Sequence, residues 1–329
     1  MRVLIVGAGV IGTVYGAHLA AAGSAVSVLS HGSRSDEVAT GGLAARDVID
    51  GRQVHAHATV VPDATVVPDA TAVPDATAVP DATAVPDASS GYDVVLVSVR
   101  RDQLASACAE LTCLTGRPAV VFFGNNPGGH LALAKSVAGA VFLGFPGVGG
   151  VMTGTTANYV RIRQQPTALQ DVADPRLAQL EAALASQGFA VQRVADMDGW
   201  LVYHAAFVAC IAAALYRCGT DPVRLAADRK TLVLMCQAIT EAFAALRASG
   251  LAGLPRNLAV LHTPLLRPVA VRYWARTMRS PMGELCFAAH SRHAEGEMRA
   301  LGGDVTARIP GSSALAELLC PPATGRDES

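Results

Sequence analysis

The first residues of the chain contain the pattern that most restricts its fold. A short apolar run over residues 3–6 leads directly into six glycine-rich positions, which are Gly7, Ala8, Gly9, Val10, Ile11 and Gly12. Residues 13–22 then have a helical composition, Gly23 ends them, and a second apolar run follows over residues 25–29. This order of strand, glycine turn, helix and strand is typical of a unit that binds a dinucleotide.

Each glycine of such a turn has a physical role. The first permits the tight bend, the second lets the backbone approach a pyrophosphate, and the third lets helix and strand pack closely. The helix N-terminus adds free N–H groups and a partial positive charge for the phosphates. We therefore predict that residues 7–12 bind a dinucleotide, the alternative being a purely structural glycine turn.

Composition narrows the classes of protein to which the chain can belong. It has 329 residues, enough for two domains, with 16% charged residues and a net charge of −1. This balance argues against a nucleic-acid partner and against a membrane surface. The seven cysteines are dispersed, with no CxxC pair, which favours a reducing, cytoplasmic location and no metal site.

Two apolar segments could suggest a membrane. The N-terminal run after Arg2 resembles a signal peptide, but its glycines fall at dinucleotide-motif positions and a second strand follows. Residues 199–216 contain no Asp, Glu, Lys or Arg. They are rich in alanine and contain His204, so we predict a buried core helix rather than a membrane span.

Residues 61–88 form a near-perfect repeat of six residues, Val-Pro-Asp-Ala-Thr-Val/Ala. A proline at every sixth position removes backbone donors and interrupts helices and central strands. We predict that residues 60–90 are a low-complexity insertion, an extended and mostly disordered loop. A hexapeptide β-helix is the alternative, but so few units could not bury a core.

After the repeat, apolar runs suited to buried parallel strands alternate with helical segments. Strands are expected over residues 92–99, 119–123, 140–145, 160–163 and 190–194, helices over 104–114 and 132–137, and a glycine-rich turn over 146–150. Beyond residue 197 only helical periods remain, over 199–218, 228–249 and 289–301. We predict a Rossmann-type α/β domain with a doubly wound parallel sheet (1–195), an all-α domain (196–322) and a flexible tail (323–329). The ligand is expected in the cleft between the domains.

These motifs together resemble the ketopantoate reductase family (2-dehydropantoate 2-reductases), NADPH-dependent enzymes that reduce the ketone of a 2-keto acid. Arg100 stands where the family has a lysine near the cofactor, and Asn125 matches an asparagine that contacts nicotinamide and substrate. Trp200 matches the opening of the family's second-domain helix. Ser280 matches a serine that binds substrate, within Ser-Pro-Met.

The chain departs from the family at its catalytic positions. The family's catalytic lysine falls two residues after the tryptophan, where this chain has Val202. Two asparagines expected on the same helix are Ala206 and Cys210. The family's Thr-Glu pair is missing, and His290 and His293 lie near its place. The resemblance therefore implies a divergent relative.

The end of the second strand bears on the choice of cofactor. An NAD site usually has an acidic residue there, but here no acid occurs before Asp36. His31 and Arg34 would suit a 2′-phosphate, and Arg100 adds a cation from a neighbouring strand end. We therefore predict NADP as the cofactor, the alternative for Arg34 being a solvated loop residue.

Reduction of a ketone also needs a proton donor and a group that holds the substrate. His204 is the candidate donor, with Asn125 beside the reacting groups and Tyr203 as a second possible donor. Position 204 points about 160° away from position 202 on a helix, and a satisfied core histidine is the alternative interpretation.

Candidate substrate ligands follow in the second domain. They are Ser280, Arg276 and His293. His290, His293 and Glu297 share one helical face, which is typical of an exposed charged helix and only weakly of a metal site.

Three functions fit these observations. The first is an oxidoreductase that transfers hydride between NADPH and a small 2-keto acid or related carbonyl compound, an enzyme acting on CH–OH groups. The second is a nucleotide-binding redox sensor or partner protein that has lost catalysis, which Val202 favours. The third makes the repeat an acidic recruiting arm. We expect a small-molecule substrate and no nucleic-acid or membrane partner, and the sequence leaves a homodimer open.

Overall fold

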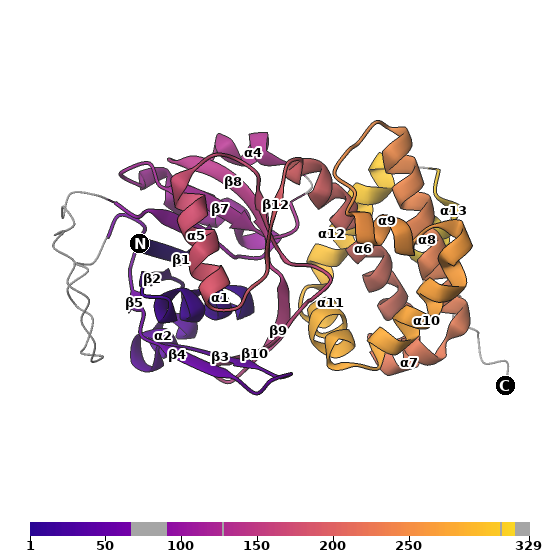
Figure 1. The fold of residues 1–329 in the computed structure, drawn as a ribbon, viewed down its shortest axis with the longest axis horizontal. Coiled ribbons are helices and arrows are strands. Elements are labelled where there is room, and N and C mark those ends of the chain that lie inside the picture. The colour runs from indigo at the N-terminus through magenta and orange to yellow at the C-terminus, as the bar shows by residue number, and fades with distance from the viewer. Residues whose placement is uncertain (67–90, 127, 310, 320–329) are drawn as a thin grey trace. The chain divides into compact units, whose positions relative to one another are not determined.

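The computed structural model describes residues 1–66, 91–126, 128–309 and 311–319 (Figure 1). The chain forms two compact units. The first consists of residues 1–124, 130–147 and 152–193, and the second of residues 125–129, 148–151 and the chain from Val194 onward.

The first unit is built on an eight-stranded sheet with the order β12-β11-β8-β7-β6-β1-β2-β5. Its strands are β1 (Arg2–Val6), β2 (Ala25–Leu29), β5 (Thr59–Val60), β6 (Val94–Val97), β7 (Ala119–Phe123), β8 (Ala140–Phe145), β11 (Thr167–Gln170) and β12 (Val191–Val194). The pairs from β5 to β8 are parallel, and β11 joins β8 antiparallel. Counted along the chain, the parallel strands have the order 3-2-1-4-5-6 of the Rossmann fold. The predicted fold class is confirmed.

Helices cover this sheet. They are α1 (Val10–Ala21), α2 (Ser33–Gly41), α3 (Leu104–Glu110), α4 (His130–Ala134) and α5 (Pro175–Ser186), with short 3₁₀ turns η1 (Arg101–Gln103) and η2 (Leu111–Cys113). Helices α1 and α5 lie side by side in front of the sheet (Figure 1). The central strands β1 and β6 are buried on both faces, which explains their uninterrupted apolar sequences.

A second sheet has the order β4-β3-β10-β9 and was not predicted. Its strands are β3 (Leu43–Asp47), β4 (Gln53–Ala56), β9 (Val148–Thr153) and β10 (Thr156–Arg161). Residues 160–163 were expected in the main sheet, but Val160 and Arg161 belong to β10 and the other two residues to no strand. The expected turn over residues 146–150 passes into β9. These strands are partly exposed, so they lack the continuous apolar runs that mark a buried parallel strand.

The first hexapeptide of the sequence repeat, residues 61–66, packs on the main sheet. The Val61 amide donates to the Val28 carbonyl at 2.9 Å, and the side chains of Val61 and Ala64 are buried. The Tyr92 hydroxyl donates to the Val66 carbonyl at 2.6 Å. This corrects the N-terminal limit of the predicted loop. Residues 67–90 and the predicted tail over 323–329 lie outside the described residues, and the predictions for them stand as such.

The second unit is helical. Its helices are α6 (Met197–Arg217), α7 (Pro222–Ala227), α8 (Arg229–Ala248), α9 (Arg256–Leu261), α10 (Arg267–Met278), α11 (Ala289–His293), α12 (Glu295–Arg308) and α13 (Ser313–Leu319), with the 3₁₀ turn η3 (Pro264–Leu266) and the π-helix η4 (Gly283–Ala288). The helix expected over residues 289–301 breaks at Ala294, which is the C-cap of α11 and the N-cap of α12.

Helix α6 forms the centre of this unit. It packs against α8, α12 and α13, and nearly all of its residues are buried. By length and composition alone, α6 and α8 could each cross a membrane. The burial of α6 among the other helices explains why it contains so few charged residues, because a core helix is apolar on all sides.

His262 is a buried polar residue in this apolar core. Its ring lies among Phe207, Phe243 and Trp274, with ring centroids 5.9–6.3 Å away. Neither of its ring nitrogens has a hydrogen-bond partner among the described residues. Burial therefore lowers the pKa of His262 to about 4, because the charged imidazolium cannot be solvated there.

We expect this histidine to make the fold sensitive to acid. The pKa of His262 lies below its unfolded value, so the unfolded chain binds the proton first as the pH falls. The stability that the neutral ring contributes is complete above about pH 6.5 and decreases toward pH 4. Between about pH 7.5 and 5, the variant His262→Leu should lose about 2 kcal/mol less unfolding free energy than the parent chain.

Urea unfolding at the two pH values measures this difference. The control variant is His57→Leu, because His57 is exposed. It should lose as much stability on acidification as the parent chain does. Equal losses in all three proteins would contradict the assignment.

Candidate functional site

The glycine turn begins with a backbone conformation that favours glycine. Gly7 has φ +90°, and its amide donates to the Leu29 carbonyl at 2.9 Å. A Cβ atom at this position would lie 2.8 Å from Val99 Cγ1. The Ser98 hydroxyl donates to the Gly7 carbonyl at 2.9 Å and fixes the turn against the end of β6. The first glycine therefore makes the bend, as predicted from the motif.

The other two glycines differ sharply in their surroundings. A Cβ atom on Gly12 would collide with the Gly7 carbonyl oxygen and would lie 2.7 Å from Ser98 Oγ and 2.9 Å from Ile5 Cγ2. A Cβ atom on Gly9 would meet nothing within 4 Å. Gly12 is thus required for the packing of α1 on β1, whereas Gly9 leaves open space beside the turn.

The N-terminus of α1 has the features of a phosphate site. Gly9 is its N-cap residue and provides no side-chain cap, so the first amide groups of this twelve-residue helix are not capped by a side chain. Their N–H groups and the helix dipole favour an anion. Together with the open space at Gly9, this geometry fits the pyrophosphate of a dinucleotide.

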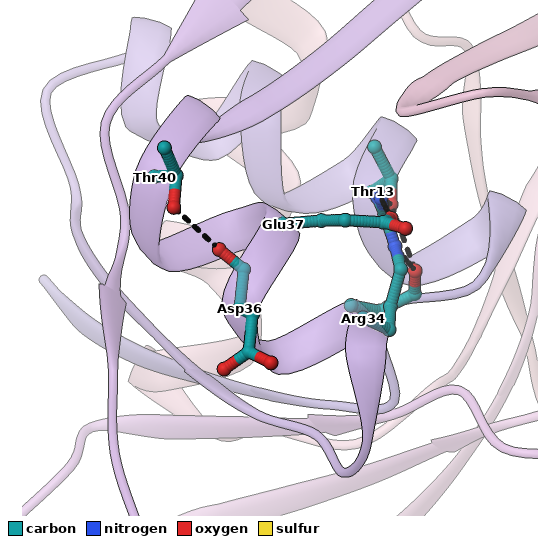
Figure 2. A network of polar contacts seen from close by, with 6 residues as sticks. Thr13, Arg34, Asp36, Glu37 and Thr40 are labelled. Atoms are coloured by element: carbon teal, nitrogen blue, oxygen red, sulfur yellow. Dashed lines mark hydrogen bonds and ion pairs between the residues drawn. The ribbon is translucent and has the colours of Figure 1, made fainter.

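Arg34 lies over the glycine turn (Figure 2). Its Nε donates to the Ala8 carbonyl at 2.8 Å, and its Nη2 donates to Thr13 Oγ1 at 3.0 Å. Its Nη1 donates to the Glu37 carboxylate at 2.7 Å. The sequence alternatives for Arg34 were a phosphate ligand and a solvated loop residue, and the structure gives it a third role as a brace of the turn.

The two other residues predicted to bind the 2′-phosphate, His31 and Arg100, are more exposed. His31 is paired with the Glu110 carboxylate at 3.0 Å, and its side chain is 71% exposed. Arg100 forms a two-pronged pair with Asp102 at 3.1 and 3.3 Å. Both lie just beyond the ends of their strands, β2 and β6, where cofactor ligands of this fold are found.

The second unit brings two predicted catalytic residues together. His204 Nδ1 lies 3.1 Å from Asn125 Oδ1, although the residues are 79 positions apart. The His204 ring stacks on Trp200, with centroids 5.0 Å apart and planes at 7°. Trp200 lies one helical turn earlier on α6, so the helix and the indole fix the orientation of the imidazole.

Burial determines the charge of His204. Its side chain is buried, and desolvation lowers its pKa to about 3, with a further decrease from nearby His290. The pKa of His290 is itself lowered, first by burial and then by His293. His204 is therefore neutral near pH 7. Sequence analysis placed His290 on an exposed helix face, but it is only partly exposed and close enough to influence His204.

Tyr203, the alternative proton donor, and Val202, which stands in the position of the family's lysine, have different surroundings. The Tyr203 hydroxyl donates to the Leu251 carbonyl at 2.9 Å, and its ring is fully buried against Phe243. Val202 is buried in the helical core. Because α6 is enclosed by other helices, positions 202 and 204 are both buried even though they point in different directions.

The three candidate substrate ligands lie around the π-helix η4. The Ser280 hydroxyl donates to the Thr277 carbonyl at 2.6 Å, at the end of α10. Arg276 is exposed on the same helix. His293 is exposed on α11, with Nδ1 2.7 Å from the Ala289 carbonyl. In the described part of the chain, no group of three or more His, Cys, Asp or Glu residues is arranged to hold a metal ion.

The glycine turn and the strand order define a dinucleotide-binding protein of the Rossmann class. The sequence model of the family described as ketopantoate reductase PanE/ApbA matches residues 3–172, just over half of the chain. The chain therefore belongs to this family, and the resemblance noted from its motifs is confirmed. It is an oxidoreductase of the 2-dehydropantoate 2-reductase type, which acts on CH–OH groups and depends on a nicotinamide cofactor.

Solved structures share the whole fold. A PanE/ApbA family ketopantoate reductase from Ralstonia eutropha JMP134 is 20% identical, with a TM-score of 0.70 and 97% of each chain covered. D-mandelate dehydrogenase, solved with NADH and anilino(oxo)acetate, is 14% identical, with a TM-score of 0.68 over 97% of this chain and 96% of that one. A 2-dehydropantoate 2-reductase from Methylococcus capsulatus is 18% identical, with a TM-score of 0.61 over 97% and 94%. Among curated protein sequences, no match was found.

Because Gly9 and Gly12 have different surroundings, we expect their alanine substitutions to affect different properties, which are nucleotide binding for Gly9 and stability for Gly12. Gly12→Ala should lower the unfolding free energy by about 2 kcal/mol or more, because the added methyl group forces α1 away from β1. Gly9→Ala should cost less than about 1 kcal/mol. It should nevertheless weaken binding of a nicotinamide dinucleotide at least about tenfold, because its methyl group occupies the space that the pyrophosphate needs.

Thermal unfolding without nucleotide and fluorescence titration with NADPH measure the two effects separately. A Gly9→Ala variant that binds NADPH as tightly as the parent chain would remove the glycine turn from the cofactor site.

Proposed function

We propose that the chain is an NADP-dependent reductase that transfers hydride between NADPH and a small 2-keto acid or related carbonyl compound. The observation that supports this proposal best is the buried pair of His204 and Asn125, because it offers an oriented imidazole on the helix from which the family's lysine is lost, although position 204 faces another side of that helix than Val202. The open glycine turn supports the cofactor part of the proposal.

The residues of the first unit fit a nicotinamide dinucleotide. The α1 N-terminus and Gly9 would hold its pyrophosphate. When bound, the nicotinamide supplies or accepts the hydride. Arg34 and Arg100 are cations beyond the ends of β2 and β6 and support NADP, with the His31 imidazole as a further candidate ligand of the 2′-phosphate. After three of its bonds are made, Arg34 still has two N–H groups for a phosphate.

His204 would handle the proton. With the Asn125 amide oriented as in the structure, Oδ1 accepts from Nδ1–H, which leaves the lone pair on Nε2. In this tautomer Nε2 takes the proton from a substrate hydroxyl during oxidation, and the imidazolium returns a proton to the alkoxide oxygen during reduction.

A bound substrate would also alter the pKa of His204. Burial keeps the ring neutral, with a pKa of about 3. A substrate carboxylate beside the ring would raise that pKa, because an opposite charge stabilises the imidazolium. Ser280, Arg276 and His293 are the residues that we propose bind this carboxylate or the rest of the substrate.

We also propose a cellular location, a substrate class and an oligomeric state for the chain. The described cysteines are all free thiols, which supports a reducing, cytoplasmic location. We propose a small molecule as substrate. A homodimer is proposed as the assembly, supported by a Staphylococcus aureus ketopantoate reductase that is 14% identical, has a TM-score of 0.63 and is described as dimeric.

Titration with NADPH and NADH, followed by addition of 2-keto acids to the NADPH-saturated protein, tests the function. We expect binding of NADPH and oxidation that depends on a keto acid, with ketopantoate as the first compound. Binding without turnover across a panel of carbonyl compounds would instead favour the nucleotide-sensing alternative that the buried Val202 suggests.

His204→Gln should lower kcat about 100-fold or more, because general acid–base catalysis contributes at least that much. The NADPH dissociation constant should change little. The matched control is Tyr203→Phe, which removes a neighbouring hydroxyl that already bonds to a backbone carbonyl, so turnover should persist. Loss of turnover in Tyr203→Phe with retention in His204→Gln would reverse the assignment of the donor.

A further inference from the structure

The Arg34 guanidinium donates hydrogen bonds to three residues, and one of them, Glu37, is negatively charged. Ala8 and Thr13 belong to the glycine turn and the first turn of α1, and Glu37 lies one turn after Arg34 on α2. The side chain of Arg34 is 19% exposed and that of Glu37 is 39% exposed. Figure 2 shows the Glu37 carboxylate reaching back toward Arg34, whereas the Asp36 carboxylate points away from it.

This arrangement matters for any nucleotide bound at the turn. The end of the second strand of a Rossmann fold faces the ribose that bears the 2′-hydroxyl of NAD or the 2′-phosphate of NADP. Arg34 on α2 is the cation just beyond that strand end. Its pairing with Glu37 places a carboxylate beside the same guanidinium that a 2′-phosphate would need.

The carboxylate affects the two nucleotides differently. It neutralises part of the Arg34 charge, which weakens the attraction between the guanidinium and the phosphate dianion of NADPH. The ribose hydroxyl of NADH carries no charge, so its binding depends little on the charge of Arg34. The sequence pointed to NADP because no acid precedes Asp36, but in the fold Glu37 reaches the guanidinium from one helical turn away.

We propose that Glu37 is a specificity-determining residue that lowers the preference of this chain for NADPH over NADH by holding the Arg34 guanidinium. The inference rests on the proposed nucleotide-binding function. The pairing of Glu37 with Arg34 would let the chain bind both NADPH and NADH, while Arg34 would still attract the 2′-phosphate of NADPH.

The test compares dissociation constants for NADPH and NADH, measured by nicotinamide fluorescence on the full chain. Glu37→Gln keeps the size of the side chain and removes its charge, and NADPH should then bind about fivefold more tightly while NADH does not. Asp36→Asn is the matched control, because it makes the same change in net charge one residue away. It should alter both constants less than about twofold.

A double-mutant cycle with Arg34→Gln isolates the coupling. In the Arg34→Gln background, the further change Glu37→Gln should no longer shift the ratio of the two dissociation constants. Equal effects of Glu37→Gln and Asp36→Asn, or an effect that persists without Arg34, would overturn the inference and leave the proposed function intact. Failure of both nucleotides to bind the parent chain and its variants would overturn the proposed function and the inference together.

Discussion

The close approach of α1 to β1 at Gly12 is the constraint on which the rest of the first unit depends. No side chain larger than hydrogen fits there, because the Gly7 carbonyl oxygen, Ser98 Oγ and Ile5 Cγ2 already fill the space. This contact sets the direction in which α1 leaves the sheet. It therefore also sets where the uncapped amides of the helix point. One packing contact thus determines both the stability of the βαβ unit and the position of its anion site.

The same helix connects the two sheets of this unit. Its first turn contacts the end of β1, and farther along His18 is hydrogen-bonded to Tyr159 of β10 at 2.8 Å. Tyr15 lies between them and shares hydrogen bonds with Thr167 and the Gly147 amide. These buried polar contacts specify one orientation of α1, because a misplaced helix would leave their hydroxyl and imidazole groups without partners.

The sequence was most informative where burial is complete. Residues 25–29, 119–123 and 140–145 were predicted as strands with the bounds that the structure has, since a parallel strand covered on both faces must be apolar throughout. The strands β3 and β4 could not be found in this way, because each exposes part of its surface and neither has a continuous apolar run. An apolar run in the sequence indicates that a strand is buried. It does not by itself indicate which strands pair, so partly exposed strands such as β3 and β4 are missed.

The site residues also differ in how well the sequence alone predicts their contacts. The glycines of residues 7–12 have roles that follow from backbone geometry, and such roles are local enough to be assigned from spacing. The contact of His204 with Asn125 joins positions 79 residues apart, and no pattern along the chain encodes it. The partner of Arg34 was missed for a related reason. Glu37 lies eight residues after the end of β2, and its carboxylate becomes a neighbour of Arg34 only because both residues share one side of α2.

In the proposed reaction, His204 would supply the proton that the lysine supplies in the family, although the lysine's own position holds Val202 and faces another side of α6. An ammonium group in the core needs solvation or an anionic partner to keep its charge, and a buried imidazole avoids that cost by remaining neutral. Stacking on Trp200 and the bond to Asn125 preserve its orientation without any charge. Because burial lowers the pKa of His204 to about 3, the proposed role would require a bound substrate anion that raises this pKa. The proposed mechanism would therefore make turnover depend on the negative charge of the substrate.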